Sequence, residues 1–227
     1  MKNFAIILCV LLSATTVQSQ IIGNAGFAIG ADATMITIGA EKQFNLLSSQ
    51  KLHINPGLRV NMFSGKNLDY ITAPANLTAE DGNIDTIGLS TISDNFANLY
   101  VHIKYDFSSK LSIGFDIDLL GVSFGGEQKG DFTPGANGAA AGSMAAMNVP
   151  ASPTSVNYLV MADLDNGSLN STLTLSYKLN DNLGLDLGGG LVFTEYTSTT
   201  EIGFDKNDRF RNKSFMGYIG ISYVIMK

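Results

Sequence analysis

Several segments of the chain alternate strictly between apolar and polar residues, which is the pattern of a β-strand with one apolar and one polar face. The clearest runs from residue 99 to 107, where every second residue is Leu, Val, Ile, Tyr or Phe. A similar segment begins at Leu111 after a three-residue interval, so the two segments predict a hairpin with a tight turn. The segments 169–179 and 183–193 repeat this plan and predict a second hairpin.

The alternation predicts eight strands. The stretch from 21 to 44 is divided in two because its apolar phase reverses between Phe27 and Ile36. Short connections alternate with long ones, of which 64–97 and 125–168 are the longest. Such loops are unusual in a compact soluble domain and ordinary on the outer side of a membrane barrel. The predicted strands lie near residues 21–30, 34–44, 51–63, 98–107, 111–124, 169–179, 183–197 and 210–226.

The two faces of these strands favour a membrane barrel over a soluble antiparallel barrel or sandwich. The polar faces carry mainly Asn, Ser, Thr and Gly, which suits a narrow, filled lumen. We therefore predict an all-β fold, an eight-stranded antiparallel up-and-down transmembrane β-barrel with long extracellular loops. Five aromatic residues on the apolar faces lie near the short turns, as an interfacial aromatic belt requires. They are Phe44, Tyr105, Phe107, Tyr177 and Tyr223.

Composition and the first residues narrow the class further. With 45% hydrophobic residues and a mean hydropathy of +0.15, the chain is too apolar for a disordered segment. Residues 1–19 combine Lys2, an apolar run and a small-residue end, the order of a secretory signal peptide, which leaves residues 20–227 as the barrel domain. The one Cys, Cys9, lies in this peptide, so no disulfide is expected. The 14 basic and 20 acidic residues argue against nucleic-acid binding.

The end of the chain carries a more specific motif. Residues 218–225 read YIGISYVI and follow the pattern polar-x-Gly-x-x-aromatic-x-hydrophobic. Its four defined positions are Tyr218, Gly220, Tyr223 and Ile225. This segment is similar to the signal by which the barrel-assembly machinery recognises its clients, and the whole chain resembles the small outer-membrane β-barrel proteins of Gram-negative bacteria. The resemblance implies export to the cell outer membrane, contact with outer-membrane lipid and with the assembly machinery, and a monomeric state. It brings no known activity.

The charged and polar residues of the predicted strands point into the lumen. If residue 107 pairs with 111, His102 lies opposite Asp116 and Tyr100 opposite Asp118. A His beside a carboxylate is half of an acid–base pair, but no motif places a nucleophile, and charges inside so narrow a barrel must be paired in any case. We therefore predict a lumenal polar network with no catalytic residue, cofactor or metal. Its members are Glu41, His53, Arg59, Tyr100, His102, Lys104, Asp116, Asp118 and Asp186.

Two loop features add hypotheses. The segment 135–147 is small, apolar and uncharged, which fits a mobile spacer, a short helix or a contact with lipid or protein. Asp and Asn side chains at 163–166 and 205–208 are potential cation ligands, although turns favour these residues anyway. The run from Gly188 to Gly190 lies within a strand and is expected to ease its curvature.

Three functions from different classes follow. The first, which we favour, is a non-enzymatic envelope or surface-interaction protein with a lumen filled by side chains. The second is a narrow channel or carrier for small molecules, and the third is a membrane enzyme that uses His102 and Asp116. A soluble lipocalin-like binder is the remaining alternative, with its apolar faces turned inward.

Overall fold

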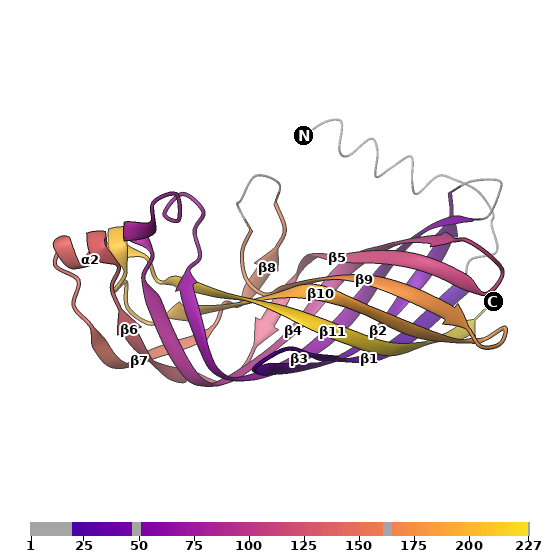
Figure 1. Ribbon diagram of the computed structural model, residues 1–227, viewed down its shortest axis with the longest axis horizontal. Coiled ribbons are helices and arrows are strands. Elements are labelled where there is room, and N and C mark those ends of the chain that lie inside the picture. Colours follow the sequence, from indigo (N-terminus) through magenta and orange to yellow (C-terminus); the bar gives the residue numbers. More distant parts are fainter. Residues whose placement is uncertain (1–19, 47–50, 161–164, 227) are drawn as a thin grey trace.

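The computed structural model describes residues 20–46, 51–160 and 165–226, so the predicted signal peptide at 1–19 lies outside the described residues. The fold is an all-β, antiparallel, up-and-down sheet of 11 strands (Figure 1). The strands are β1 (Gln20–Ile29), β2 (Ala33–Asn45), β3 (Leu52–Thr72), β4 (Thr86–Asp106), β5 (Leu111–Phe124), β6 (Gln128–Thr133), β7 (Ala146–Pro153), β8 (Val156–Tyr158), β9 (Leu169–Lys178), β10 (Leu183–Ser198) and β11 (Arg209–Met226). The described helices are η1 (Asp81–Asn83), α2 (Ala136–Ala140) and η2 (Phe204–Lys206). None of them is long and apolar enough to cross a membrane.

Eight strands close into a ring by hydrogen bonding, and we call it the eight-strand ring. Each strand pairs with the next in the order β1, β2, β3, β4, β5, β9, β10 and β11, and β11 pairs back to β1. These strands correspond to the eight predicted from the alternation. The tight turns at 108–110 and 179–182 lie at the end of the ring on the right of Figure 1.

The predicted strand count and the two long loops are wrong. β3 runs on to Thr72 and β4 begins at Thr86, so 73–85 connects them rather than 64–97. The predicted loop 125–168 contains β6, β7 and β8. β3 and β4 continue past their predicted ends because inward apolar residues such as Tyr70 and Ile87 pack into an apolar core there.

The extra strands build a second closed ring, which we call the six-strand ring. β3, β4, β10 and β11 extend out of the eight-strand ring, and β6 and β7 join them. Four long strands therefore run through both rings without interruption. The six-strand ring and the three short helices form the left end of the molecule in Figure 1.

The polarity of both faces reverses where one ring passes into the other. In the eight-strand ring, Asn98 of β4 points inward and is buried, and its neighbour Leu99 points outward with 52% of its surface exposed. In the six-strand ring the same strand buries Leu89 and exposes the neighbouring Ser90. The eight-strand ring is therefore polar inside and apolar outside, and the six-strand ring has the arrangement of a soluble domain.

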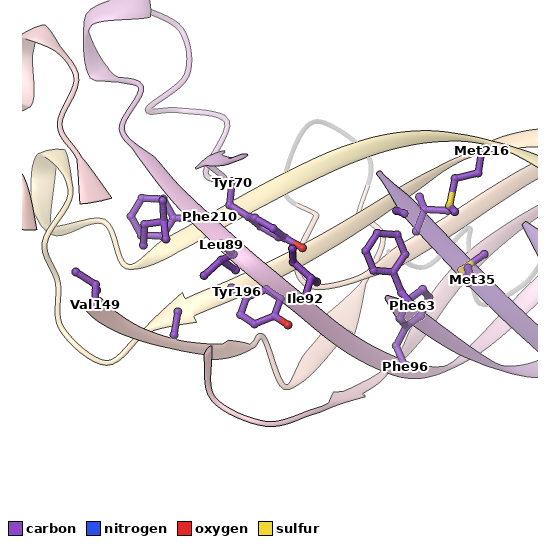
Figure 2. Packing of buried hydrophobic residues seen from close by; sticks show 14 of the residues in the cluster. Met35, Phe63, Tyr70, Leu89, Ile92, Phe96, Val149, Tyr196, Phe210 and Met216 are labelled. Carbon is purple, nitrogen blue, oxygen red and sulfur yellow. The ribbon is translucent and has the colours of Figure 1, made fainter. Parts of the chain in front are cut away.

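A continuous apolar core fills the six-strand ring and the junction between the rings (Figure 2). Tyr70 and Tyr196 meet edge to face, with ring centroids 5.2 Å apart, and the Tyr70 hydroxyl lies 2.8 Å from the hydroxyl of Thr194. Burial raises the pKa of the Tyr70 hydroxyl well above its ordinary value of 10.0. At the junction lies a layer that we call the apolar layer, made of Ala28, Met35, Phe63, Phe96 and Met216, each at most 2% exposed.

Candidate functional site

The interior of the eight-strand ring holds a small polar cavity of about 70 Å³. Alternation along the strands turns polar side chains into it from every part of the ring. Six members of the predicted network are buried: Glu41, His53, Arg59, Tyr100, Asp118 and Asp186. Asp118 lies beside the cavity and does not line it. Its charged lining residues are Glu41, Arg59, His102, Lys104, Asp116 and Asp186.

Arg59 on β3 is the centre of one cluster in this cavity. Its Nε donates to Asp118 at 2.7 Å, its Nη1 to Asp116 at 2.5 Å and its Nη2 to the carbonyl oxygen of Asn170 at 2.7 Å. The guanidinium also lies 4.7 Å from the ring centroid of Tyr100. The guanidinium donates to two carboxylates and one carbonyl oxygen, and these acceptors offset the cost of burying its positive charge.

Glu41 on β2 is the centre of the second cluster. Asn55 Nδ2 and the Tyr100 hydroxyl donate to its two oxygens at 2.7 and 2.9 Å. His102 Nδ1 lies 3.1 Å from both oxygens. His102 and Asp116 are opposite each other in the ladder of β4 and β5, as the sequence predicts. His102 and Asp116 do not form the acid–base pair that the enzyme hypothesis requires. The imidazole of His102 contacts Glu41, and the carboxylate of Asp116 pairs with Arg59.

The remaining predicted members lie toward the tight turns. His53 Nε2 is 3.1 Å from Asp106, its Nδ1 is 2.7 Å from the Asn45 side chain, and Lys104 Nζ is 3.7 Å from Asp106. Asp186 is buried on β10. Below the cavity, an open polar basin of about 670 Å³ is lined by His53, Lys104 and Asp106 together with the residues of the tight turns.

The apolar layer covers the opposite side of the cavity. On β2, Met35 is the inward-facing residue next to the cavity residue Thr37. On β11, Met216 is the inward-facing residue next to the cavity residue Tyr218. The two Phe rings, Phe63 and Phe96, complete the layer and are fully buried. Polar side chains therefore line the ring from the tight turns to its middle, and tightly buried apolar side chains fill it from there to the junction with the six-strand ring.

The chemistry of the site is that of a filled interior. Every charged side chain of the two clusters has a partner of opposite charge. Within the described part of the chain, no group of three or more His, Cys, Asp or Glu side chains has the arrangement of a metal site. Asp163, one of the potential cation ligands, lies outside the described residues.

The residues of the C-terminal motif divide between the two faces of β11. Tyr223 and Ile225 point outward, with 52% and 61% of their surface exposed, while Gly220 is on the inner face. The Tyr218 phenol lies where a Cβ atom on Gly220 or on Gly26 would stand. Glycine at 220 therefore makes room for the Tyr218 side chain inside the ring.

Sequence reasoning missed several buried charged groups, among them Asp94, Glu195 and Arg211. It also missed Asp85, which organises the far end of the six-strand ring. Its carboxylate accepts the backbone N–H groups of Gly135 at 2.8 Å and Phe204 at 2.6 Å, so one side chain holds two connections. Next to them the segment 135–147 begins with helix α2, and Met144 and Met147 are 81% and 78% exposed. An Asp in a connection carries no periodic signal, so only the folded structure shows this role.

Solved structures that resemble this chain are outer-membrane β-barrel proteins, and the matches cover most of it. Neisserial surface protein A is 12% identical with a TM-score of 0.39, over 91% of this chain and 96% of that one. A major outer membrane protein of Thermus thermophilus is 11% identical with a TM-score of 0.37, over 91% and 99%. Ail, the attachment invasion locus protein of Yersinia pestis, is 9% identical with a TM-score of 0.35, over 90% and 97%. No family model and no curated protein matches the sequence.

Proposed function

We propose that this protein is an integral outer-membrane β-barrel protein without enzymatic activity, which holds a rigid module outside the membrane for envelope structure or surface interaction. The eight-strand ring is the transmembrane barrel and the six-strand ring is the external module. The observation that carries the proposal is the reversal of polarity between the two rings. The same four strands expose Leu, Ile, Phe and Tyr around one ring and bury such residues within the other.

The apolar belt has the dimensions that a membrane requires. On β11, Phe215, Ile219, Ile221 and Tyr223 are each at least 50% exposed and alternate along the outer face. This stretch matches the ~9 to 11 residues with which a tilted strand crosses a bilayer. A soluble domain that exposed such a belt on every side would aggregate.

The paired interior supports a closed barrel rather than a channel or an enzyme. Arg59, Glu41 and their partners occupy the middle of the lumen, and the apolar layer lies across it. The hypothesis of a membrane enzyme loses its proposed pair, since His102 and Asp116 have separate partners. The external module then presents the uncharged segment 135–147, with exposed Met144 and Met147, far from the membrane.

Export and insertion complete the proposal. Residues 1–19 act as the signal peptide, and the motif ending at Ile225 is read by the barrel-assembly machinery, after which the barrel remains a monomer in outer-membrane lipid. The outward position of Tyr223 and Ile225 on β11 supports this, because an assembly factor can reach them from outside the ring.

The first experiment is the gel mobility of the protein from isolated outer membranes, unheated and boiled. A folded barrel resists detergent, so we expect a heat-dependent shift in mobility. An unshifted protein in the soluble periplasmic fraction would contradict the proposal. Planar-bilayer recording of the folded protein then separates the two membrane functions: we expect no ion conductance, and discrete conductance steps would favour the channel.

A further inference from the structure

A hollow of about 530 Å³ lies on the outer face of the eight-strand ring, over β5, β9 and β10. We call it the outer groove. Its floor is the backbone of the Gly188 to Gly190 run, whose role the proposed function does not explain. Its apolar side chains are Ile113, Phe115, Leu173, Leu175, Leu187, Leu191 and Phe215.

Gly189 opens the groove on the outer face, whereas Gly188 and Gly190 share the inward phase of β10 with Asp186 and Val192. A Cβ atom on Gly188 or Gly190 would collide with main-chain carbonyl oxygens of Leu173 and Ser171, so β10 lies unusually close to β9 at this point. Gly189 is opposite Gly217 on β11, and neither position places a side chain between its neighbours on the outer face. The outer surface is thus hollow between the large side chains of Leu187, Leu191 and Phe215.

The walls of the groove are apolar and its polar groups are occupied. Leu187 and Leu191 flank Gly189 along β10 and are 50% and 46% exposed. Phe215, at 71% exposed, overhangs the floor, with its Cζ atom 3.2 Å from the place of a Cβ on Gly189. The Ser171 hydroxyl lies within hydrogen-bond distance of the Leu191 carbonyl oxygen. A water molecule in the groove would therefore lack the two to four polar partners that it needs.

We propose that the outer groove binds one acyl chain of a membrane phospholipid. This inference rests on the proposed function, because it takes the eight-strand ring to lie in a bilayer. In that position the medium around the groove is hydrocarbon, and a lipid acyl chain is the apolar component that can occupy a hollow with this apolar lining. The chain gains dispersion contacts with the walls and the glycine floor that it lacks on a flat part of the belt.

The test uses the absence of Trp from the sequence. A single Trp is introduced by Leu187→Trp at the groove or by Ile38→Trp on β2, which is 55% exposed on another part of the ring. The folded proteins in detergent are titrated with phosphatidylethanolamine that carries brominated acyl chains, which quench Trp on contact. We expect half-maximal quenching of the groove Trp at about threefold lower lipid concentration than at the control position, because the groove adds dispersion contacts.

Filling the groove gives a second, independent readout. Gly189→Leu adds bulk whose nearest neighbours are the flexible Phe215 ring and the Met216 carbonyl oxygen at 3.4 Å, so the strand can retain its place. Ala40→Leu places the same side chain at an exposed position of β2. By native mass spectrometry after addition of the same lipid, we expect Gly189→Leu to reduce the lipid-bound fraction about threefold and Ala40→Leu to leave it unchanged.

Equal quenching at both Trp positions would overturn the groove proposal, and so would protection of the groove Trp from quenching, which would mean that another protein surface covers it. The Trp comparison stands even if Gly189→Leu fails to fold. Vesicles made entirely of the brominated lipid distinguish failure of the groove proposal from failure of the membrane-barrel proposal. Quenching at both positions there leaves the membrane barrel in place, whereas absence of quenching at both contradicts the proposed function itself.

Discussion

His102 on β4 contacts Glu41 on β2, two strands away around the eight-strand ring, with its Nδ1 3.1 Å from both carboxylate oxygens. β3 lies between these strands in the sheet, so the contact passes through the interior. It links β2 with β4 across β3 and gives Glu41 three donors, from Asn55, Tyr100 and His102.

Glu41→Ala is expected to destabilise the barrel by about 3–5 kcal/mol, because it leaves buried donors without their shared acceptor. Glu41→Gln keeps the shape and one acceptor oxygen, and its effect should be smaller. The measurement is the urea midpoint of unfolding, followed by gel mobility in lipid or detergent. Equal midpoints for Glu41→Ala and the natural protein would show that the cluster contributes nothing to stability.

Gly114 and His102 should be coupled. The Nε2 atom of His102 lies where a Cβ atom on Gly114 would stand, so Gly114→Val forces the imidazole away from Glu41. We expect a loss of about 1–3 kcal/mol from overpacking, and a smaller loss when His102→Ala is also present. A double-mutant cycle from the four unfolding free energies measures the coupling, and strict additivity would contradict the contact.

Arg59→Met should be the most harmful substitution in the lumen. It leaves Asp116 and Asp118 without their cation, at a cost of about 3–5 kcal/mol. The matched control is Lys178→Met, which breaks an exposed ion pair with Asp181 and should change stability little. A refolding yield of Arg59→Met equal to that of the control would refute the central role of this guanidinium.

Asp85→Ala should loosen the far end of the six-strand ring and leave the barrel intact. The substitution removes the acceptor of the Gly135 and Phe204 N–H groups, which costs about 1–3 kcal/mol for each group that stays buried. Limited proteolysis should then cut near 135–147 and 199–208 at lower protease concentration. Asp85→Asn retains one acceptor oxygen and serves as the control, and an unchanged cleavage pattern for Asp85→Ala would disprove this role.

Alkaline pH should weaken the six-strand ring. Burial raises the pKa of the Tyr70 and Tyr196 hydroxyls above the ordinary value of 10.0, so the folded ring retains protons that the unfolded chain releases. Stability is therefore full below pH 10 and falls as pH rises above it. Protease resistance of the external module, measured across this range, should fall less steeply in Tyr70→Phe. Identical pH profiles for the two proteins would contradict the effect.

The eight-strand ring could be predicted from the sequence because most of its strands alternate between a polar and an apolar face over a long stretch. The six-strand ring could not. Along β4 the inward phase slips between Leu89 and Ile92, and β7 contains two prolines, Pro150 and Pro153, which weaken any strand signal.

The sequence indicates which residues face the interior of the ring, but it does not indicate which of them pair with one another. Register arithmetic relates neighbouring strands, and it correctly placed His102 opposite Asp116. Glu41 and His102 lie on strands that do not pair, so their contact depends on the curvature and closure of the ring. Arg59 likewise spans from β3 to Asp116 and Asp118 on β5.

The four strands common to both rings give the molecule mechanical strength. β3 and β4 pass directly from the eight-strand ring into the six-strand ring and remain paired from Leu52 with Tyr105 to Ile71 with Thr86. A force that pulls on the external tip acts along these strands and loads many ladder hydrogen bonds in parallel, as shear, instead of opening them one after another. Under such a load the six-strand ring keeps its position relative to the eight-strand ring.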